Sequence, residues 1–139
     1  MITGEQLINQ ARLWIDTPFH YQGRKRGVGV DCVGLAIGPL TELGAIDWDY
    51  KNYSNPPNPD ELLHLVEKHC TPLADFEVGA LLLFGYKGLP YHSVLFAGAG
   101  RAIQASQASA VMKVVEHDLD QRHRRKIVGV YRLPGVSHG

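Results

Sequence analysis

The chain has 139 residues, with 14 Lys and Arg against 14 Asp and Glu, so its formal net charge is zero. Hydrophobic residues make up 45% and charged residues 20%, which is typical of a globular protein and argues against disorder. The balanced charge gives no overall attraction for nucleic acid or for an anionic membrane. We therefore expect a single domain spanning residues 1–139.

The cysteine count and the apolar stretches exclude several further classes. Cys32 and Cys70 are too few for a disulfide framework or a four-thiolate zinc site, and we expect no metal or other cofactor. No apolar stretch approaches the ~20 residues that span a bilayer. The first residues lack the apolar core of a signal peptide, so we expect synthesis in the cytoplasm.

A first helix is predicted near the N-terminus. Thr3 can cap it, its apolar residues recur at helical spacing as far as Ile15, and Thr17-Pro18 ends it. Residues 19–30 follow as a predicted loop, because glycines interrupt a basic run there.

Two more helices complete the first half of the chain. The second is predicted to begin at Asp31 or Cys32 and to stop at Gly44, and its apolar residues on nearly all sides predict a buried helix. Asn58, followed by proline and acidic residues, predicts the start of a third helix that ends near His69.

The second half of the chain has the pattern of a sheet. Five strands are predicted, at residues 79–84, 91–97, 101–106, 111–116 and 127–133. Glycines at 98 and 100 predict a tight hairpin between the second and third of them. Helices followed by strands indicate an α+β fold, with the helices packed on a five-stranded antiparallel sheet.

Cys32 lies at the predicted N-terminus of the most apolar helix. Free backbone N–H groups and the helix dipole there favour the thiolate, which is the nucleophilic form. The same N–H groups can stabilise an oxyanion. The alternative is that Cys32 is a small buried hydrophobic residue. Asp31 can likewise either cap the helix or pair with a substrate ammonium.

Two polar residues on neighbouring strands are candidates to assist a cysteine nucleophile. His92 opens an apolar strand, which is a rigid platform for a base. Gln104 lies on the next strand, within cross-strand reach of an amide-to-imidazole hydrogen bond that would orient the ring. The alternatives are a hydrogen-bonded edge histidine and a solvent-facing glutamine. His117 and His123 flank a charged segment that is predicted to be a solvated helical turn.

These features resemble the NlpC/P60 family of papain-like cysteine peptidases, and most closely its branch found in phage tails and gene-transfer agents. The resembling segments are residues 17–22, 27–35, 77–84, His92 at the start of its strand, 103–105 and 124–134. The resemblance implies a papain-like α+β fold without a cofactor. It implies Cys32 as the nucleophile, His92 as the base and Gln104 in the orienting position.

The family's usual reaction is the hydrolysis of peptidoglycan stem peptides, commonly between D-glutamate and a diamino acid. The resemblance therefore implies acyl transfer by a thiol and an imidazole. Phe19, Tyr21, Asp31 and Arg24 are the candidate substrate-binding residues. Phe19 stands where the family usually has tyrosine. The basic loop that contains Arg24 can meet stem-peptide carboxylates, or it can simply be solvated.

As a phage-tail component, the protein would be carried to the cell wall by the virion, with tail-tip or hub proteins as partners. The basic segment 122–126 is then a docking surface or a solvated turn. One alternative is a catalytically impaired structural tail-tip or tail-assembly protein, which Phe19 and Gln104 favour. Another is an acyltransferase or amidase that uses the same thiol–imidazole pair. A zinc hydrolase is least favoured, because no two histidines have ligand spacing on one helix face.

Overall fold

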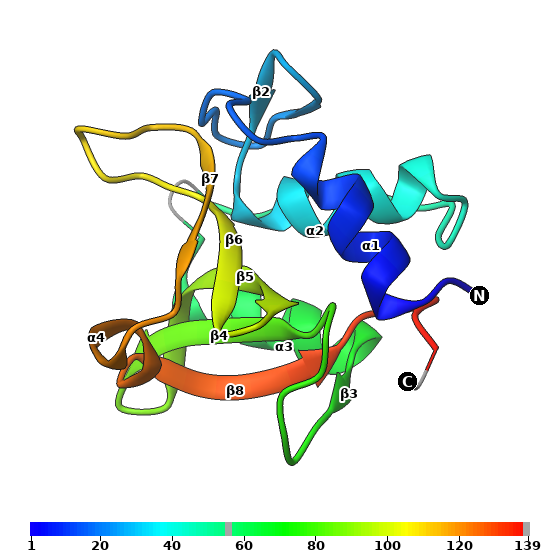
Figure 1. The fold of residues 1–139 in the computed structure, drawn as a ribbon. Helices are drawn as coiled ribbons and strands as arrows, with labels where there is room; N and C mark the ends of the chain where they lie inside the picture. Colours follow the sequence, from blue (N-terminus) through cyan, green and yellow to red (C-terminus); the bar gives the residue numbers. More distant parts are fainter. Residues whose placement is uncertain (55–56, 138–139) are drawn as a thin grey trace.

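The computed structural model describes residues 1–54 and 57–137. Its elements, in chain order, are α1 (Gly4–Arg12), β1 (Arg24–Lys25), β2 (Gly29–Val30), α2 (Cys32–Glu42), α3 (Pro59–His69), β3 (Thr71–Pro72), β4 (Leu81–Tyr86), β5 (Leu89–Gly98), β6 (Arg101–Ala105), β7 (Val114–Asp118), α4 (Gln121–Arg124) and β8 (Ile127–Arg132) (Figure 1). The predicted α+β order is confirmed. No helix in the described part of the chain has the length and apolar character needed to cross a bilayer.

The three predicted helices begin at their predicted caps. Thr3 and Gln6 form a reciprocal capping box at α1, and the side chain of Asn58 accepts the N–H of Glu61 at the start of α3. The first helix is shorter than predicted, because α1 ends at Arg12 and Asp16 adopts a φ of 73°. A left-handed residue at this point cannot continue an α-helix.

The main sheet is antiparallel and has the order β3-β8-β4-β5-β6-β7. It has six strands where five were predicted, because Thr71 and Pro72 pair with the end of β8. Ala99 and Gly100 both have positive φ and form the predicted tight turn between β5 and β6. The fourth predicted strand is shifted, since β7 covers residues 114–118 rather than 111–116.

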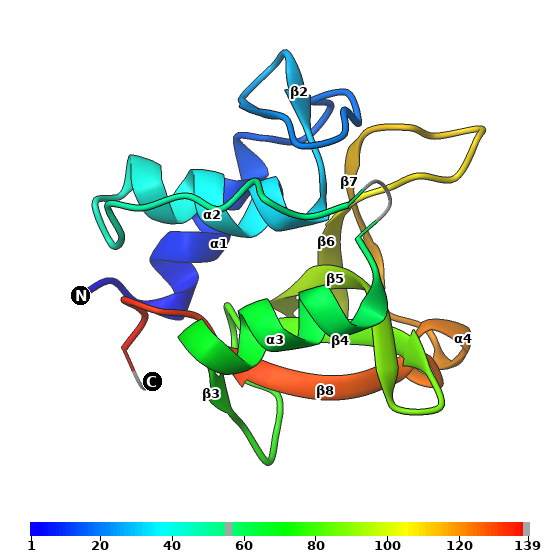
Figure 2. The ribbon, with the colours of Figure 1, turned by 180° about the vertical axis from the view of Figure 1, so that it is seen from behind.

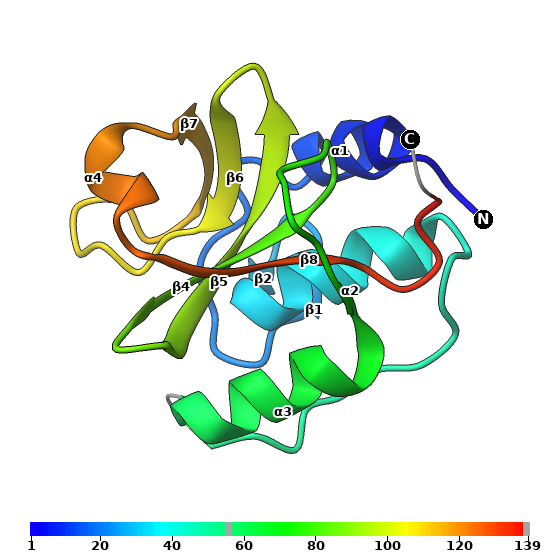
Figure 3. The ribbon, with the colours of Figure 1, turned by 90° about the horizontal axis from the view of Figure 1, so that it is seen from below.

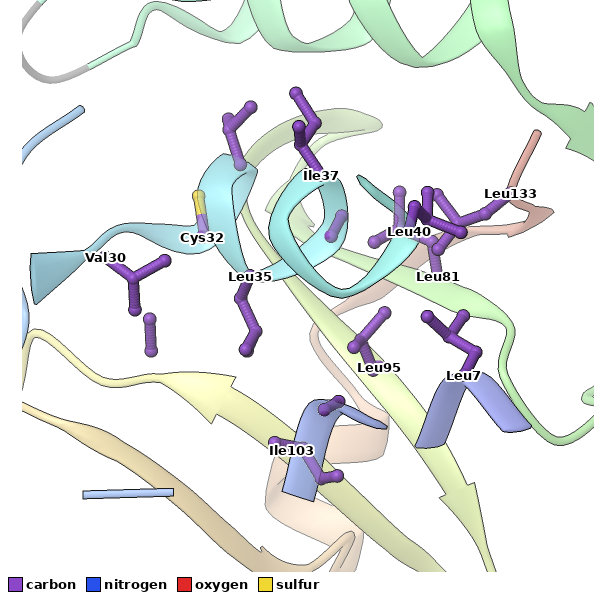
Figure 4. Packing of buried hydrophobic residues seen from close by; sticks show 14 of the residues in the cluster. Leu7, Val30, Cys32, Leu35, Ile37, Leu40, Leu81, Leu95, Ile103 and Leu133 are labelled. Atoms are coloured by element: carbon purple, nitrogen blue, oxygen red, sulfur yellow. The ribbon is translucent and has the colours of Figure 1, made fainter. Parts of the chain in front are cut away.

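Helices α1, α2 and α3 pack on one face of this sheet, with β5 in contact with all three (Figures 2 and 3). Their core is formed by side chains that are almost completely inaccessible to solvent, among them Leu7, Leu35, Leu95 and Ile103 (Figure 4). A second, smaller apolar cluster, centred on Leu82, lies on the other face of the sheet. The buried second helix is therefore confirmed.

The segment 19–30, predicted as a loop, contains the two-stranded hairpin of β1 and β2. Arg24 pairs with Val30, and Phe19 forms a parallel bridge to the same Val30. Only Asp31, the N-cap, separates the hairpin from the first residue of α2. The segment thus holds the start of the helix in place, although its glycines favoured an irregular structure.

Gly34 in the first turn of α2 allows this hairpin to approach the helix closely. A Cβ atom at position 34 would lie 2.4 Å from the carbonyl oxygen of Gly23 and 2.8 Å from a methyl group of Val30. A backbone carbonyl cannot move aside as the end of a flexible side chain can. The glycine is therefore required by packing.

We predict that Gly34→Ala lowers the free energy of unfolding by about 1–3 kcal/mol, because the added methyl overpacks the contact with Gly23. Elsewhere in a helix interior the same change stabilises by about 0.5–1 kcal/mol, so the two effects have opposite signs. Urea unfolding followed by circular dichroism measures the change. Thr41→Ala, on the exposed part of α2, is the control and should have an effect within about 0.5 kcal/mol. A stabilised Gly34→Ala variant would contradict the packing argument.

Candidate active site

The start of α2 positions the candidate nucleophile. Asp31 is the N-cap, and its Oδ1 accepts the backbone N–H of Gly34 at 2.8 Å. Cys32 is consequently the first helical residue, the second of the two predicted starts, and only 8% of its surface is exposed. Figure 4 shows its sulfur atom at the open end of the helix, beside the apolar core.

Burial dominates the ionisation of this thiol. Loss of solvation raises the pKa of Cys32 to about 11, and the negative charge of Asp31 acts in the same direction. Hydrogen bonds to the sulfur from Ser93 and from the Val33 N–H oppose the shift only in part. The N–H groups at the helix start thus favour the thiolate as expected, but burial outweighs their effect on the pKa. Cys32 is a neutral thiol at pH 7, and a base must remove its proton.

Ser93 connects the nucleophile to the sheet. Its hydroxyl is buried and donates to the Cys32 carbonyl oxygen at 3.5 Å. This contact joins the start of α2 to β5, the strand that also carries His92. Ser93 is therefore a direct polar contact between the start of the helix and that strand.

The predicted hydrogen bond between His92 and Gln104 is present. His92 Nε2 lies 2.9 Å from Gln104 Oε1, across the β5–β6 pair. Burial lowers the pKa of His92, while the bond to Gln104 and the charge of Asp31 act against that decrease. The positive charge of Lys126 lowers it further. The imidazole is thus a neutral, oriented group that can accept a proton.

Cys32 and His92 lie on neighbouring elements but are not in direct contact. Side chains alternate along a strand, so Ser93 faces α2 whereas His92 leaves β5 on the other side, next to Phe84 and Gln104. Within residues 1–54 and 57–137, no hydrogen bond joins the Cys32 sulfur to the His92 ring. Catalytic hydrogen bonds of this kind often tighten only when substrate binds.

The carboxylate of Asp31 is at the centre of a buried polar cluster. Besides Gly34, it accepts hydrogen bonds from the Gln22 N–H at 2.8 Å, from Arg24 Nη1 at 3.0 Å and from the hydroxyl of Tyr53. Asp31 is only 2% exposed. The capping role considered for Asp31 is therefore present, and the carboxylate has further partners besides the cap.

Arg24 is not part of a solvated loop. All of its N–H groups have partners within the protein: the side chains of Asp31, Asp49 and Tyr53 and the carbonyl oxygens of Gly23 and Tyr50. Its side chain is 11% exposed. A substrate carboxylate could bind Arg24 only by displacing one of these partners, so the observed role of Arg24 is to hold the segment 49–53 against α2.

The two aromatic candidates lie close to the same cluster. Phe19 is half-buried against the core and donates its backbone N–H to the Met112 carbonyl oxygen at 2.9 Å. The Tyr21 hydroxyl donates to the Tyr53 carbonyl oxygen at 3.4 Å. Burial raises the pKa of Tyr21, the negative charges of Asp31 and Glu61 add to this effect, and a thiolate at Cys32 would add to it further. Tyr21 thus provides a phenol near the thiol, where Phe19 has none.

Three residues of this region were not found from the sequence. Strand alternation next to His92 could have indicated Ser93. No local pattern in the sequence indicated Tyr53, because it is 22 residues away from Asp31 in the sequence and contacts it only in the folded protein. His117 was predicted only to flank a solvated helical turn, but it lies on β7 and its Nε2 is 2.7 Å from Gln104 Nε2.

A hollow of about 290 Å³ opens beside the imidazole. Its lining includes Tyr91, His92, Gln104, His123 and Lys126. A substrate seated in it would contact both a candidate base and a positive charge. In the described ranges, 1–54 and 57–137, no group of three His, Cys, Asp or Glu side chains is placed to hold a metal ion.

Comparison with known proteins identifies the family. The sequence profile of the NlpC/P60 family matches residues 16–129, which include Cys32, His92 and Gln104. The chain belongs to the NlpC/P60 family. A comparison with curated protein sequences gave no significant match.

Solved NlpC/P60 structures have the same fold. The NlpC/p60 domain of the peptidoglycan hydrolase SagA is 19% identical, with a TM-score of 0.64 over 95% of this chain and 100% of that one. An NlpC/P60 family protein from Bacillus cereus ATCC 10987 is 18% identical, with a TM-score of 0.69 over 95% of this chain. The peptidoglycan hydrolase RipB from Mycobacterium tuberculosis is 20% identical, with a TM-score of 0.65 over 94% of this chain. The match covers only 40% of the B. cereus protein and 64% of RipB.

We predict that the alkylation rate of Cys32 in the folded NlpC/P60 domain is low at neutral pH and rises with an inflection near pH 11, because burial disfavours the thiolate. Iodoacetamide labelling followed by peptide mass mapping measures the rate. A Cys70→Ala background removes the second thiol. The urea-unfolded chain is the control, with an inflection near the ordinary thiol value of about 8.5. An inflection below that value in the folded protein would contradict the burial argument.

We predict that Tyr53→Phe lowers the free energy of unfolding by about 1–3 kcal/mol, because it removes a donor to a buried carboxylate. Tyr50→Phe is a matched control, since the neighbouring Tyr50 ring stacks on Tyr53 and its hydroxyl has no hydrogen bond within the described residues. Thermal unfolding of both variants gives the comparison. Equal stability of the two variants would show that the Asp31 carboxylate does not depend on the Tyr53 hydroxyl.

Proposed function

We propose that the protein is a cysteine endopeptidase that hydrolyses peptidoglycan stem peptides. The observation that carries the proposal is the placement of Cys32 at the start of α2, against β5, whose His92 is hydrogen-bonded to Gln104 on β6. Membership of the NlpC/P60 family and the peptidoglycan hydrolases among its structural neighbours support this substrate class. The bond between D-glutamate and a diamino acid is the proposed site of cleavage.

The first half-reaction begins with a neutral thiol and a neutral imidazole. When substrate binding brings the Cys32 and His92 side chains into contact, the free imidazole nitrogen takes the thiol proton as the sulfur attacks the amide carbonyl. Asp31 already occupies the N–H of Gly34, which leaves the N–H of Cys32 for the oxyanion, together with that of Val33 once the sulfur has moved away from it. The imidazolium then protonates the leaving amine, and the acyl group remains on the sulfur.

The second half-reaction uses the same groups in reverse order. His92 removes a proton from a water molecule, which attacks the thioester carbonyl. The sulfur leaves as the thiolate and recovers the proton from the imidazolium. Gln104 keeps the ring oriented through both steps, because its oxygen holds Nε2 of His92.

The hollow beside His92 suits an anionic substrate. Lys126 places an ammonium group on its lining, and stem peptides carry carboxylates. With the N–H groups of Arg24 engaged inside the protein, Lys126 is the more accessible partner for such a carboxylate. We assign it to substrate binding within the same proposal.

The proposed setting is a phage or phage-like tail, in which neighbouring tail proteins bring the domain to the cell wall. This part rests on the resemblance of the sequence to the phage-tail branch of the family. The protein would be made in the host cytoplasm and would act at the bacterial wall.

A second candidate function is a structural tail-tip or tail-assembly protein that retains the fold without activity. Two observations favour it. Phe19 cannot supply the hydroxyl group usual at its position, and Cys32 makes no hydrogen bond to the His92 ring within the described residues. The two candidates differ in whether the purified protein turns over substrate.

We predict that the purified protein cleaves defined muropeptides, and that Cys32→Ala and His92→Ala each reduce cleavage at least about 10³-fold, because both half-reactions need a nucleophile and a base. Mass spectrometry of the products identifies the bond that is cut. Cys70→Ala is the matched control, and it should retain wild-type activity because Cys70 lies at the end of α3. Intact muropeptides after prolonged incubation with folded wild-type protein would favour the structural role.

A further inference from the structure

The side-chain amide of Gln104 lies between two imidazole rings. Its Oε1 is 2.9 Å from His92 Nε2, and its Nε2 is 2.7 Å from His117 Nε2. His117 Nδ1 in turn lies 2.8 Å from the backbone carbonyl oxygen of Asp118. Strands β5, β6 and β7 each contribute one side chain to this polar chain.

The carbonyl group of Asp118 fixes the direction of each hydrogen bond in the series that runs from His117 through Gln104 to His92. A carbonyl oxygen only accepts, so His117 Nδ1 carries the hydrogen. Neutral imidazole has a single N–H group, so His117 Nε2 accepts and the amide of Gln104 must donate to it. The amide oxygen of Gln104 then faces His92 and requires a hydrogen on Nε2. The unshared electron pair of His92 is left on Nδ1.

We propose that His117 is a positioning residue that acts through Gln104 to hold His92 in the tautomer whose Nδ1 is basic. The inference rests on the proposed function, because Nδ1 is then the atom that takes the Cys32 proton. Without an acceptor at position 117, the side-chain amide of Gln104 can rotate by a half turn, which exchanges the positions of its oxygen and its nitrogen. The Gln104 NH₂ group would then donate to His92 Nε2 and favour the His92 tautomer that is protonated on Nδ1. In that tautomer Nδ1 has no free electron pair and cannot accept the thiol proton.

The neighbourhood of His117 is consistent with an orienting role. The ring is half-buried, and the ring of His123 lies 4.7 Å away between centroids. His123 is itself held by Asp120, whose Oδ1 is 2.7 Å from His123 Nδ1. His117 is therefore the ring in this pair that contacts Gln104.

The test measures the tautomers directly, by two-bond ¹H–¹⁵N correlation spectra of the imidazole rings at neutral pH. In the wild-type protein, we expect His92 protonated on Nε2 and His117 protonated on Nδ1. His117→Ala is expected to shift His92 toward the tautomer with its proton on Nδ1. With muropeptide substrate, kcat should fall about tenfold and KM should stay within about twofold, because orientation rather than binding is lost.

Two further variants separate positioning from a general structural effect. His117→Gln provides a carbonyl oxygen that can accept from the Gln104 amide, so it should restore the wild-type spectrum and most of kcat. In a Gln104→Glu background the carboxylate can only accept, so it holds His92 Nε2–H without help. There His117→Ala should change neither the tautomer nor kcat. His64→Ala, on the exposed side of α3, is the matched histidine control and should behave as the wild type.

The inference is overturned if wild-type His92 carries its proton on Nδ1, a result that needs no variant to fold. It is also overturned if folded His117→Ala leaves both the His92 tautomer and kcat unchanged. A tautomer shift in a protein that cleaves no muropeptide would support the positioning role of His117 and would count against the hydrolase instead.

Discussion

The position of the candidate nucleophile depends on one buried carboxylate. Asp31 caps α2, and four donors surround it: the N–H groups of Gln22 and Gly34, the guanidinium of Arg24 and the hydroxyl of Tyr53. A buried charge is tolerated only when it is paired and hydrogen-bonded. Because these donors come from three separate segments, the carboxylate fixes the hairpin of β1 and β2, the start of α2 and the segment 49–53 relative to one another. Cys32, the next residue in the chain, is fixed with them.

The same enclosure determines how the cysteine can react. A helix N-terminus exposed to water would stabilise a thiolate, but at Cys32 the loss of solvation and the nearby Asp31 charge outweigh that effect. A neutral thiol needs a base at the moment of attack. The chemistry is therefore divided between two parts of the fold: α2 supplies the sulfur and the N–H groups, and the sheet supplies an imidazole whose proton position is set by its neighbours.

Most of the fold could be predicted from local signals along the chain. Caps at Thr3, Asp31 and Asn58 are short-range features, and the helices begin at each of them. The strands β4, β5, β6 and β8 follow from apolar runs between turns. The first helix and the fourth predicted strand were placed with wrong ends. Two further elements were missed because they have no local signal. Two-residue β3 is a strand only because β8 lies beside it, and the hairpin of β1 and β2 forms in spite of its glycines because it packs on α2.

The sequence by itself determined the family, the cysteine at the helix start and the His92–Gln104 hydrogen bond, because each depends on residues that are close in the chain or paired across one hairpin. Only the tertiary structure decided how those groups are solvated and what else they touch. It turned Arg24 inward, raised the pKa of Cys32 and placed His117 against Gln104. Desolvation and hydrogen-bond partners come from segments that meet only after folding, so no local pattern in the sequence carries them.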